Sequence, residues 1–232
     1  MKNIVLIGTG KGIGNETLKL LSGKYNITSL SRSKFDFSHN ENTKHYEFDV
    51  LKDDFSSIEF QEEIHGLVYF PGSINLKPFN RLTVDDFKND FEINVLGAIK
   101  AMQFLLPHLK KSHDASIVLF SSVAAKMGMP FHASVSVAKS AIEGLVKSFA
   151  AEYSSQNIRC NAIAPSLTDT PLAQNLLSTD IKRSSAAERH PLKTIGDPLH
   201  MASMVEFLLS ESSGWMTGQI IMIDGGMSSL KL

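Results

Sequence analysis

The stretch Asn3-Ile-Val-Leu-Ile-Gly-Thr-Gly-Lys-Gly-Ile-Gly14 decides the fold of this chain. Its apolar run, Ile4–Ile7, predicts a strand that is buried on both faces. Glycines follow, and an amphipathic helical pattern begins near Glu16. Glycines allow positive φ angles and a close approach to a ligand, and the free N–H groups of a helix N-terminus favour an anion. The stretch therefore predicts a diphosphate-binding turn, with a tight turn that binds nothing as the alternative.

The bulk properties are those of an ordinary soluble globular protein. The chain has 232 residues, 43% of them hydrophobic and 20% charged, with a net charge of −1. These values predict one domain spanning residues 1–232 and give no electrostatic basis for nucleic-acid binding. No apolar run reaches the roughly 20 residues of a membrane-spanning helix. Cys160 is the only cysteine, which favours a reducing cytoplasm, and the scattered histidines predict no metal site.

Strand-like and helix-like segments alternate along the rest of the chain. The alternation predicts an α/β fold, a Rossmann-type doubly wound parallel sheet of about seven strands with helices on both faces. Ligands in such sheets bind beyond the carboxyl ends of the strands. The predicted strands are Ile4–Ile7, Asn26–Ser31, His45–Val50, Gly66–Phe70, Ser116–Ser121, Asn157–Ala164 and Gln219–Ile223. The predicted helices are Glu16–Leu21, Ile58–Ile64, Val84–Leu109, Ser134–Tyr153 and Leu199–Leu209.

The second predicted strand ends in Ser31-Arg32-Ser33, a position that faces the adenosine ribose in dinucleotide-binding folds. An acidic residue here would bind the 2′-hydroxyl of NAD, whereas a basic residue suits the 2′-phosphate of NADP. Arg32 offers a planar guanidinium matched to phosphate, and Lys11 adds a cation in the glycine turn. The pair favours NADP(H) as the cofactor, and the alternative is that both are solvated surface charges.

Several motifs resemble those of the short-chain dehydrogenase/reductase family. The glycines stand as Gly8-Thr-Gly-Lys-Gly12-Ile-Gly14, and a helical Asn94 lies in Phe91-Glu-Ile-Asn-Val-Leu-Gly97. The resemblance covers Asn3–Met227 and implies hydride transfer between a nicotinamide cofactor and a small carbonyl or alcohol. The segments that carry it in the last third of the chain are Ile158–Pro171, His190–Pro198 and Trp215–Met227.

The resemblance also implies cofactor contacts along the strand ends. Groups around Leu167, Thr168 and Thr170 would bind the nicotinamide carboxamide, and Asp49 would contact the adenine unless it only caps the next turn. The family usually has Asn or Ala before the Gly that is Gly72 here, and Pro71 in that place lacks a backbone donor. The implied cofactor-binding residues are Gly8, Thr9, Gly10, Lys11, Gly12, Ile13, Gly14, Ser31, Arg32, Ser33, Asp49, Val50, Phe70, Pro71, Gly72, Lys139, Pro165, Ser166, Leu167, Thr168 and Thr170.

One member of the family's catalytic Ser, Tyr and Lys is missing. Ser122 follows the fifth predicted strand and would orient the substrate, and Lys139 stands where the Lys should be. The resemblance implies that Asn94 bends its helix and holds a water near Lys139, and the alternative is a hydrogen-bonded Asn of the core. Four residues before Lys139, however, the Tyr that exchanges a proton with the substrate oxygen is replaced by Val135. Valine cannot transfer a proton.

Three replacements for that proton donor are possible on the sequence. Ser136 could share the helix face of Lys139, but a serine hydroxyl is far less acidic than a tyrosine of pKa about 10. His132 lies near the predicted helix start, and its unperturbed pKa of about 6.5 suits proton transfer unless it simply faces solvent. Ordered water held by Ser122, Lys139 and Asn94 is the third.

Two functions of different classes follow. The first is an NADP(H)-dependent oxidoreductase for a small carbonyl or alcohol, with an altered proton donor. The second, motivated by Val135, is a catalytically inactive NADP(H)-binding sensor or partner subunit. The family commonly associates through two helices, here Val84–Leu109 and Ser134–Tyr153, which implies a homodimer or homotetramer.

The substrate would be a small molecule covered by residues 170–189. Leu172, Leu176, Leu177 and Ile181 give this segment an apolar side. The basic residues of the same region are expected to be surface charges rather than ligands of an anionic substrate. These residues are Arg183, Arg189 and His190.

Overall fold

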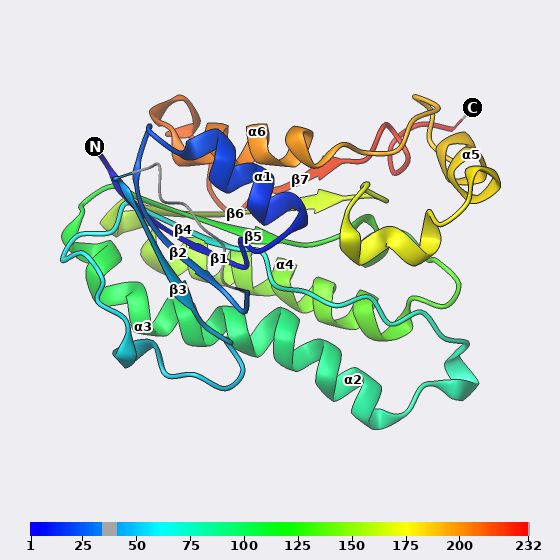
Figure 1. Cartoon of the computed structure of the whole chain (residues 1–232), viewed down its shortest axis with the longest axis horizontal. Helices are drawn as coiled ribbons and strands as arrows, with labels where there is room; N and C mark the ends of the chain where they lie inside the picture. Colours follow the sequence, from blue (N-terminus) through cyan, green and yellow to red (C-terminus); the bar gives the residue numbers. More distant parts are fainter. Residues whose placement is uncertain (34–40, 232) are drawn as a thin grey trace.

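A single sheet of parallel strands forms the centre of the molecule in the computed structural model, which describes residues 1–33 and 41–231 (Figure 1). The strands lie in the order β3-β2-β1-β4-β5-β6-β7. This is the predicted Rossmann-type sheet, in which the chain starts at the inner strand β1 and reaches both edges. The strands are β1 Asn3–Ile7, β2 Asn26–Ser31, β3 Thr43–Glu47, β4 Gly66–Tyr69, β5 Ala115–Phe120, β6 Ile158–Pro165 and β7 Ile220–Ile223.

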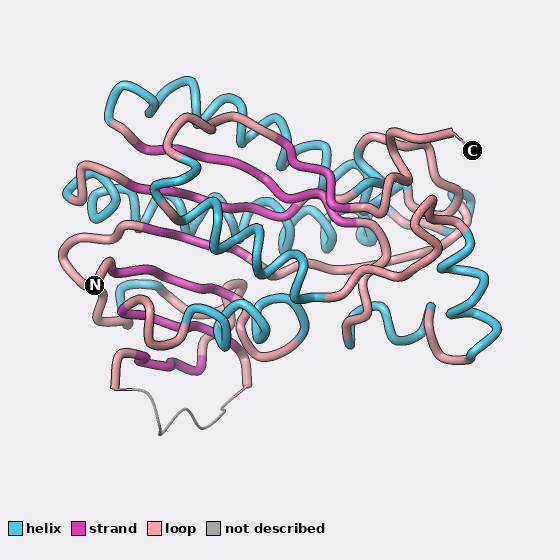
Figure 2. Tube along the Cα trace, turned by 90° about the horizontal axis from the view of Figure 1, so that it is seen from above, coloured by secondary structure: helices cyan, strands magenta, loops and turns pink. Residues whose placement is uncertain are grey.

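Helices cover both faces of the sheet, as Figures 1 and 2 show. The α1 and α6 helices pack against each other on one face of the sheet. On the other face, α4 packs against both the β6 strand and the α2 helix. The α5 helix lies beyond the strand ends, next to the C-terminal part of the chain. The helices are α1 Gly12–Leu21, α2 Val84–Phe91, α3 Gly97–Lys111, α4 Ala133–Tyr153, α5 Asp180–Glu188 and α6 Pro198–Leu209.

The apolar run of β1 explains why the sheet is covered on both sides. Successive side chains of a strand point to opposite faces. Ile4 and Leu6 therefore join the cluster that contains residues of α1 and α6, whereas Val5 and Ile7 join the cluster built from α3 and α4. All four side chains are at most 2% exposed. A strand with no polar face can be stable only between two helical layers.

The predicted helix Val84–Leu109 is continuous but changes its winding in the middle. Thr83 and Asp86 form a capping box at the start of α2. Between α2 and α3 the chain makes a π turn over Glu92–Leu96, which contains Asn94. The Tyr69 hydroxyl donates a 2.7 Å hydrogen bond to the Ile93 carbonyl. A π turn often marks a functional site, and here it lies where the resemblance implies a bend.

Two predicted elements are corrected by the structure. The third strand ends at Glu47 rather than Val50, because its neighbour β2 ends at Ser31, directly opposite Glu47. The predicted helix Ile58–Ile64 is wrong, since the segment between β3 and β4 contains the short 3₁₀ turn Phe55–Ser57 and no α-helix. Backbone groups of the 58–64 region bond instead to the end of α3: the Ile64 N–H donates to the His108 carbonyl at 3.2 Å.

The described residues lack two features that would point to other functions. No helix within residues 1–33 and 41–231 is both long and apolar enough to cross a bilayer. The same part of the chain has no group of three or more His, Cys, Asp or Glu side chains that could hold a metal ion.

Candidate functional site

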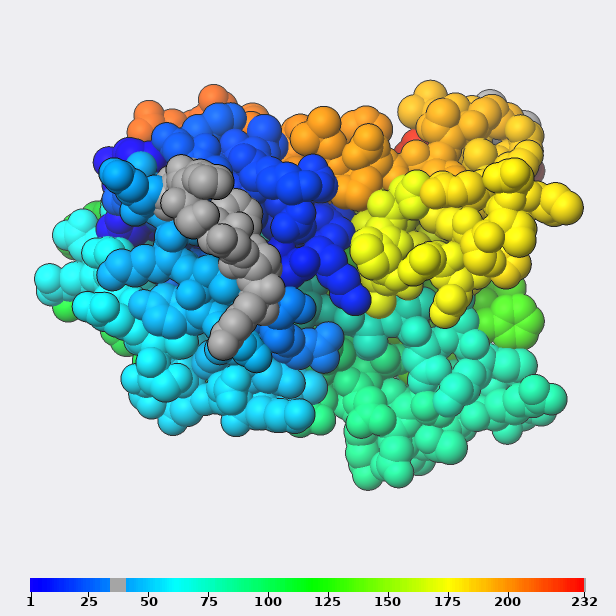
Figure 3. Space-filling model, in the orientation of Figure 1, coloured from blue at the N-terminus to red at the C-terminus, as the bar shows by residue number. Residues whose placement is uncertain are grey.

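A pocket of about 360 Å³ opens at the carboxyl ends of the strands. Figure 3 shows the blue, green and yellow segments that border it meeting on one face of the molecule. Every predicted cofactor-binding residue lines it except Thr9, and so do Ser122 and Val135. Among the residues that the structure describes, Asn94 and His132 are not part of the lining.

The glycine turn forms one end of the pocket. Gly8 has φ +95° and Gly12 φ +60°, conformations that favour glycine. A Cβ on Gly14 would overlap the Gly8 carbonyl, so α1 can start directly against the turn only without a side chain there. Within the described chain no side chain caps the first turn of α1. Its free N–H groups and the positive end of the helix dipole are available to an anion.

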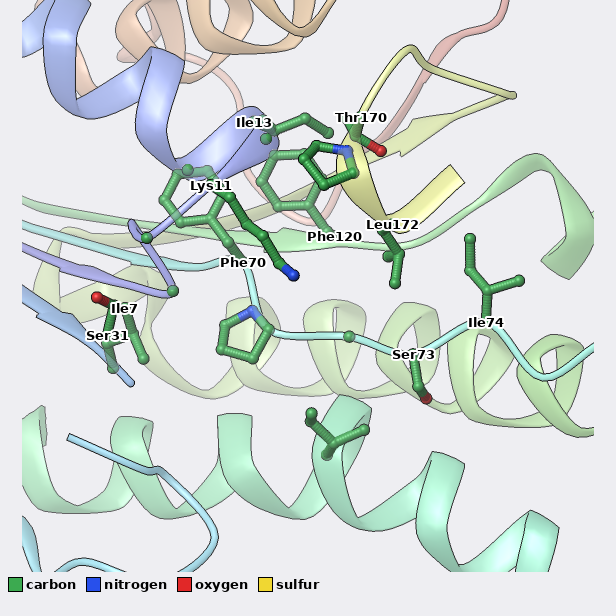
Figure 4. Close-up of a pocket in the computed structure, with 18 of the residues that line it drawn as sticks. Ile7, Lys11, Ile13, Ser31, Phe70, Ser73, Ile74, Phe120, Thr170 and Leu172 are labelled. Atoms are coloured by element: carbon green, nitrogen blue, oxygen red, sulfur yellow. The ribbon is translucent and has the colours of Figure 1, made fainter. Parts of the chain in front are cut away.

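Two cations stand at the same end. Lys11 occupies the N-cap position of α1, and Figure 4 shows its side chain extending into the pocket. Arg32 follows β2, is exposed and also lines the pocket. Ser31 between them donates to the Ser33 carbonyl at 2.9 Å. Thr9, in contrast, is fully buried, and its hydroxyl lies 2.7 Å from that of Ser29, so it supports the turn from behind.

Asp49 performs the capping role that the sequence left open. Its Oδ1 accepts a hydrogen bond from the Leu51 N–H at 3.1 Å. Asp49 and Val50 line the pocket beyond the end of β3. Contact between Asp49 and an adenine therefore stays a prediction.

Pro71 reshapes the segment after β4. A Cβ on Gly8 would lie 2.9 Å from Pro71 Cδ, so the proline ring packs directly on the glycine turn. Phe70 packs against Phe120 with ring centroids 5.2 Å apart, and both rings line the pocket. This wall of the pocket is therefore aromatic.

Lys139 is the buried cation at the other end of the pocket. Its ammonium donates a 2.8 Å hydrogen bond to the Phe120 carbonyl. Burial lowers the pKa of Lys139 to about 8, against the opposing effect of the Asp90 charge. Val135, one turn earlier on α4, is 5% exposed and presents only methyl groups to the pocket. Ser122 lies beside them, with its Oγ accepting from the Ala124 N–H at 3.2 Å.

The structure does not bring the two side-chain replacements for the missing Tyr to the pocket. The Ser136 hydroxyl donates to the Ala124 carbonyl at 2.7 Å. The His132 ring lies at the N-cap of α4 with Nδ1 2.7 Å from the Pro130 carbonyl oxygen. Neither residue lines the pocket in the described part of the chain. Lys139 is thus the lining residue near Val135 that carries an acidic proton.

A buried polar cluster that sequence reasoning missed lies behind Lys139. The Asn94 amide donates to the Ser73 hydroxyl at 3.0 Å and to the Asp90 carbonyl oxygen at 2.7 Å, and Ser73 donates to the Asp90 carboxylate. Only Ser73 of the three lines the pocket. The available signal was the spacing of Asp90 and Asn94, four residues and one helical turn apart.

The predicted nicotinamide segment forms the remaining wall. Pro165, Ser166, Leu167, Thr168 and Thr170 all line the pocket.

Ser166 stands where the family has Gly, and its hydroxyl lies 2.8 Å from His190 Nε2. His190 is buried, not at the surface as expected, because its Nδ1 bonds the Ala186 carbonyl at 2.9 Å. A carbonyl can only accept, so Nδ1 donates and Nε2 accepts the Ser166 proton. Arg183 is a partly exposed surface charge as expected, and it is paired with Asp169.

Comparison with known families gives one match over most of the chain. The model described as enoyl-(acyl carrier protein) reductase matches residues 47–228. A tropinone reductase homolog of Arabidopsis thaliana is 35% identical over 169 residues, which are 73% of this chain and 64% of the relative. The chain spans less than two thirds of the length of the first curated relatives it matches, 64%, 56% and 59%.

Solved structures match over the full length. A structure of ElxO with NADP bound is 28% identical, with a TM-score of 0.87 and 99% of both chains covered. A structure of 4-hydroxyisoleucine dehydrogenase complexed with NADH is 25% identical, with a TM-score of 0.89 and both chains fully covered. Similar chains thus bind either form of the dinucleotide.

Proposed function

Because this chain belongs to the short-chain dehydrogenase/reductase family, we propose that it is an NADP(H)-dependent oxidoreductase with an altered proton donor. Its substrate is a small carbonyl compound or the corresponding alcohol. The observation that carries the proposal is one pocket that runs from the glycine turn to Lys139. This pocket joins the cofactor-binding region to the residues that would act on the substrate.

The residues of the turn fit a dinucleotide diphosphate. Gly8 and Gly12 hold the turn in backbone conformations that favour glycine, and the start of α1 is left uncapped by any side chain among the described residues. Lys11 and Arg32 supply two positive charges at the pocket edge. A 2′-phosphate carries charge that a ribose hydroxyl lacks, so the two cations favour NADP(H) over NAD(H). The matched ElxO structure, which has NADP bound, supports this choice.

The residues at the other end fit carbonyl reduction. A bound nicotinamide would supply or accept the hydride. Ser122 orients the substrate oxygen through its hydroxyl. The Lys139 ammonium donates the proton to that oxygen, because Val135 has none to give and burial makes Lys139 more acidic than an ordinary lysine.

The substrate end of the pocket is mostly apolar. Ile74, Ile93, Val135 and Leu172 line it, and the pocket's other charged side chains stand near the glycine turn and the ends of β2 and β3. Buried apolar surface favours uncharged ligands, since an unpaired charge here would lose its hydration. The substrate class is therefore an uncharged ketone or aldehyde with an alkyl or aryl side chain.

NADPH consumption against a panel of ketones, aldehydes and quinones tests the proposal. Turnover is expected, and Lys139→Ala should remove it because it takes away the proposed proton donor. Lys147→Ala on the same helix is the matched control, since Lys147 is exposed and lies two turns away. Tight NADPH binding without turnover at any pH would contradict the proposal.

That contradicting outcome is the second candidate function, an NADP(H)-binding sensor or inactive partner subunit. Val135 favours it directly. It predicts that Val135→Tyr creates turnover where the natural chain has none.

The assembly and location that we propose follow the family. Exposed apolar residues on α4 and around α3, Val137 and Leu96, suit contact with a second copy, as a homodimer or homotetramer in the cytoplasm. Light scattering at micromolar concentration tests the assembly, and a monomer would contradict it.

A further inference from the structure

Ser166 lies on the pocket wall that connects the two ends of the site. It directly follows β6, whose neighbour β5 ends at the carbonyl that accepts from the Lys139 ammonium. Thr170, on the same wall, reaches the glycine turn, where a Cβ on Gly12 would lie 3.4 Å from it. The segment 166–170 thus runs from the Lys139 end of the pocket to the diphosphate end. A dinucleotide that occupies both ends would lie along this wall.

Both backbone groups of Ser166 are already hydrogen-bonded within the protein. Its N–H donates to the Ile223 carbonyl at 3.3 Å, and its carbonyl accepts from the Thr168 hydroxyl at 3.1 Å. The side-chain oxygen is therefore the polar group that Ser166 can present to a ligand. The Gly that the family has at this place would present none.

His190 determines which hydrogen bonds that oxygen can make. Its imidazole is 2% exposed, and Nε2 lies 2.8 Å from the Ser166 hydroxyl. Its Nδ1 donates to the Ala186 carbonyl at 2.9 Å. A neutral imidazole has one donor and one acceptor nitrogen, so Nε2 accepts the single proton of Ser166. The Ser166 oxygen keeps its lone pairs but has no proton to donate into the pocket.

The His190 ring is held in this position from two sides. Its Nδ1 is bonded to the last turn of α5 through Ala186. On another side it meets the turn that follows β7, where a Cβ on Gly225 would lie 3.6 Å from His190 Cδ2. The acceptor nitrogen is thus fixed at the Ser166 hydroxyl by packing and by a hydrogen bond to the backbone.

We propose that Ser166 accepts a hydrogen bond from the carboxamide NH₂ of the bound nicotinamide, and that His190 is the positioning residue that makes Ser166 an acceptor. This inference rests on the proposed function, because it takes the ligand to be a nicotinamide dinucleotide. Ser166 adjoins Leu167 and Thr168, around which the family resemblance places the carboxamide. An oxygen with no proton to give can pair with the NH₂ of that group but not with its carbonyl oxygen, so the pair selects one orientation of the carboxamide.

The probe for this contact is the 3-acetylpyridine analogue of NADP, in which a methyl group replaces the carboxamide NH₂. Calorimetry on the full chain gives the dissociation constants of the analogue and of NADP, and their ratio is the readout. The titrations are run at about pH 7.5, where an imidazole of ordinary pKa, about 6.5, is neutral. Ser166→Ala should lower the ratio by about three- to tenfold, which is what the loss of one neutral hydrogen bond corresponds to.

Two further variants separate the hydrogen bond from the structure. His190→Phe keeps an aromatic ring but cannot accept the Ser166 proton, so it should also lower the ratio. Combined with Ser166→Ala it should change the ratio no further, because His190 acts through Ser166. A purely structural loss would weaken the binding of both dinucleotides alike. The matched control is Ser203→Ala on α6, which removes a hydroxyl bonded to the Leu199 carbonyl and should leave the ratio unchanged.

The outcomes distinguish this inference from the proposed function. Ser166→Gly, which has the family's residue, is made alongside Ser166→Ala, so that one variant without the hydroxyl folds. NADP binding with an unchanged ratio in these variants would overturn the inference and leave the proposed function standing. An effect of His190→Phe on the ratio that persists without the Ser166 hydroxyl would overturn the positioning role. If the natural chain bound neither dinucleotide, the proposed function itself would be overturned.

Discussion

At the scale of single residues, the site is defined by Val135, which replaces the Tyr of the family, and by Lys139, which remains beside it. Val135 presents methyl groups where a proton donor is expected, and Lys139 one turn later keeps its place and its burial. The burial that lowers the pKa of Lys139 also makes its ammonium a better acid. In the function that we propose, this lysine supplies the proton in place of the Tyr.

Restoring the Tyr is the first prediction. Val135→Tyr should raise kcat/KM for carbonyl reduction by about 10²- to 10⁴-fold, the usual contribution of a well-placed general acid. Val137→Tyr is the matched control, because Val137 lies on the same helix but is 53% exposed and outside the pocket lining in the described chain. Steady-state kinetics with NADPH make the comparison. Equal kcat/KM values for the two variants would show that position 135 does not face the substrate.

The pH dependence is the second prediction. Lys139 is protonated below its pKa of about 8 and neutral above it. Reduction uses the ammonium, so its kcat should be constant below pH 8 and fall as the pH rises through that value. Oxidation of the alcohol uses the neutral amine and should rise over the same range. Rate profiles in both directions, measured at saturating cofactor, check this, and profiles with the same sign would refute it.

At the scale of elements, the glycine turn and α1 act as one unit. Gly14 lets the helix start against the Gly8 carbonyl, so the first turn of α1, with its free N–H groups, lies directly against the glycine turn. Lys11, in extended conformation at the N-cap, leaves these N–H groups free of side-chain caps within the described residues. The geometry of the turn and α1 therefore depends on the absence of a side chain at Gly14.

Gly14→Ala is the third prediction. Its Cβ would overlap the Gly8 carbonyl, so the turn must open, at a cost of about 1–3 kcal/mol as for other overpacked sites. NADPH affinity should fall together with the free energy of unfolding. In the control Gly144→Ala, the new Cβ meets nothing within 4 Å, and better helix propensity should stabilise α4 by about 0.5–1 kcal/mol. Urea unfolding with and without NADPH measures both, and unchanged NADPH affinity in Gly14→Ala would count against the diphosphate site.

At the scale of the whole molecule, local patterns predicted the sheet but not the contacts between distant segments. Apolar runs such as Ile4–Ile7 predict their strands because burial on both faces permits no other structure. The end of β3 could not be predicted in the same way, since it depends on where β2 ends. The 58–64 region fails for a similar reason, because its backbone partners lie on α3.

The same distinction holds within the site. The glycine turn, Ser122 and Lys139 are recognisable from motifs. The pairs Ser73 with Asp90 and Ser166 with His190 join residues 17 and 24 positions apart, and only the folded chain brings them together. The departures from the family pattern, Pro71, Val135 and Ser166, were visible in the sequence, but the residues that surround them in the fold were not.

Calorimetric titration with NADPH and NADH tests the central claim, that this pocket is an NADP(H) site, most directly. Lys11 and Arg32 both face the dinucleotide end, and each charge-assisted contact contributes about 1.5–3 kcal/mol before exposure weakens it. NADPH should therefore bind at least about tenfold more tightly than NADH, since 1.4 kcal/mol is a factor of ten. Arg32→Asp should reverse the order, and Arg81→Asp, outside the pocket lining in the described chain, should not. Equal affinities, or tighter NADH binding by the natural chain, would contradict the account.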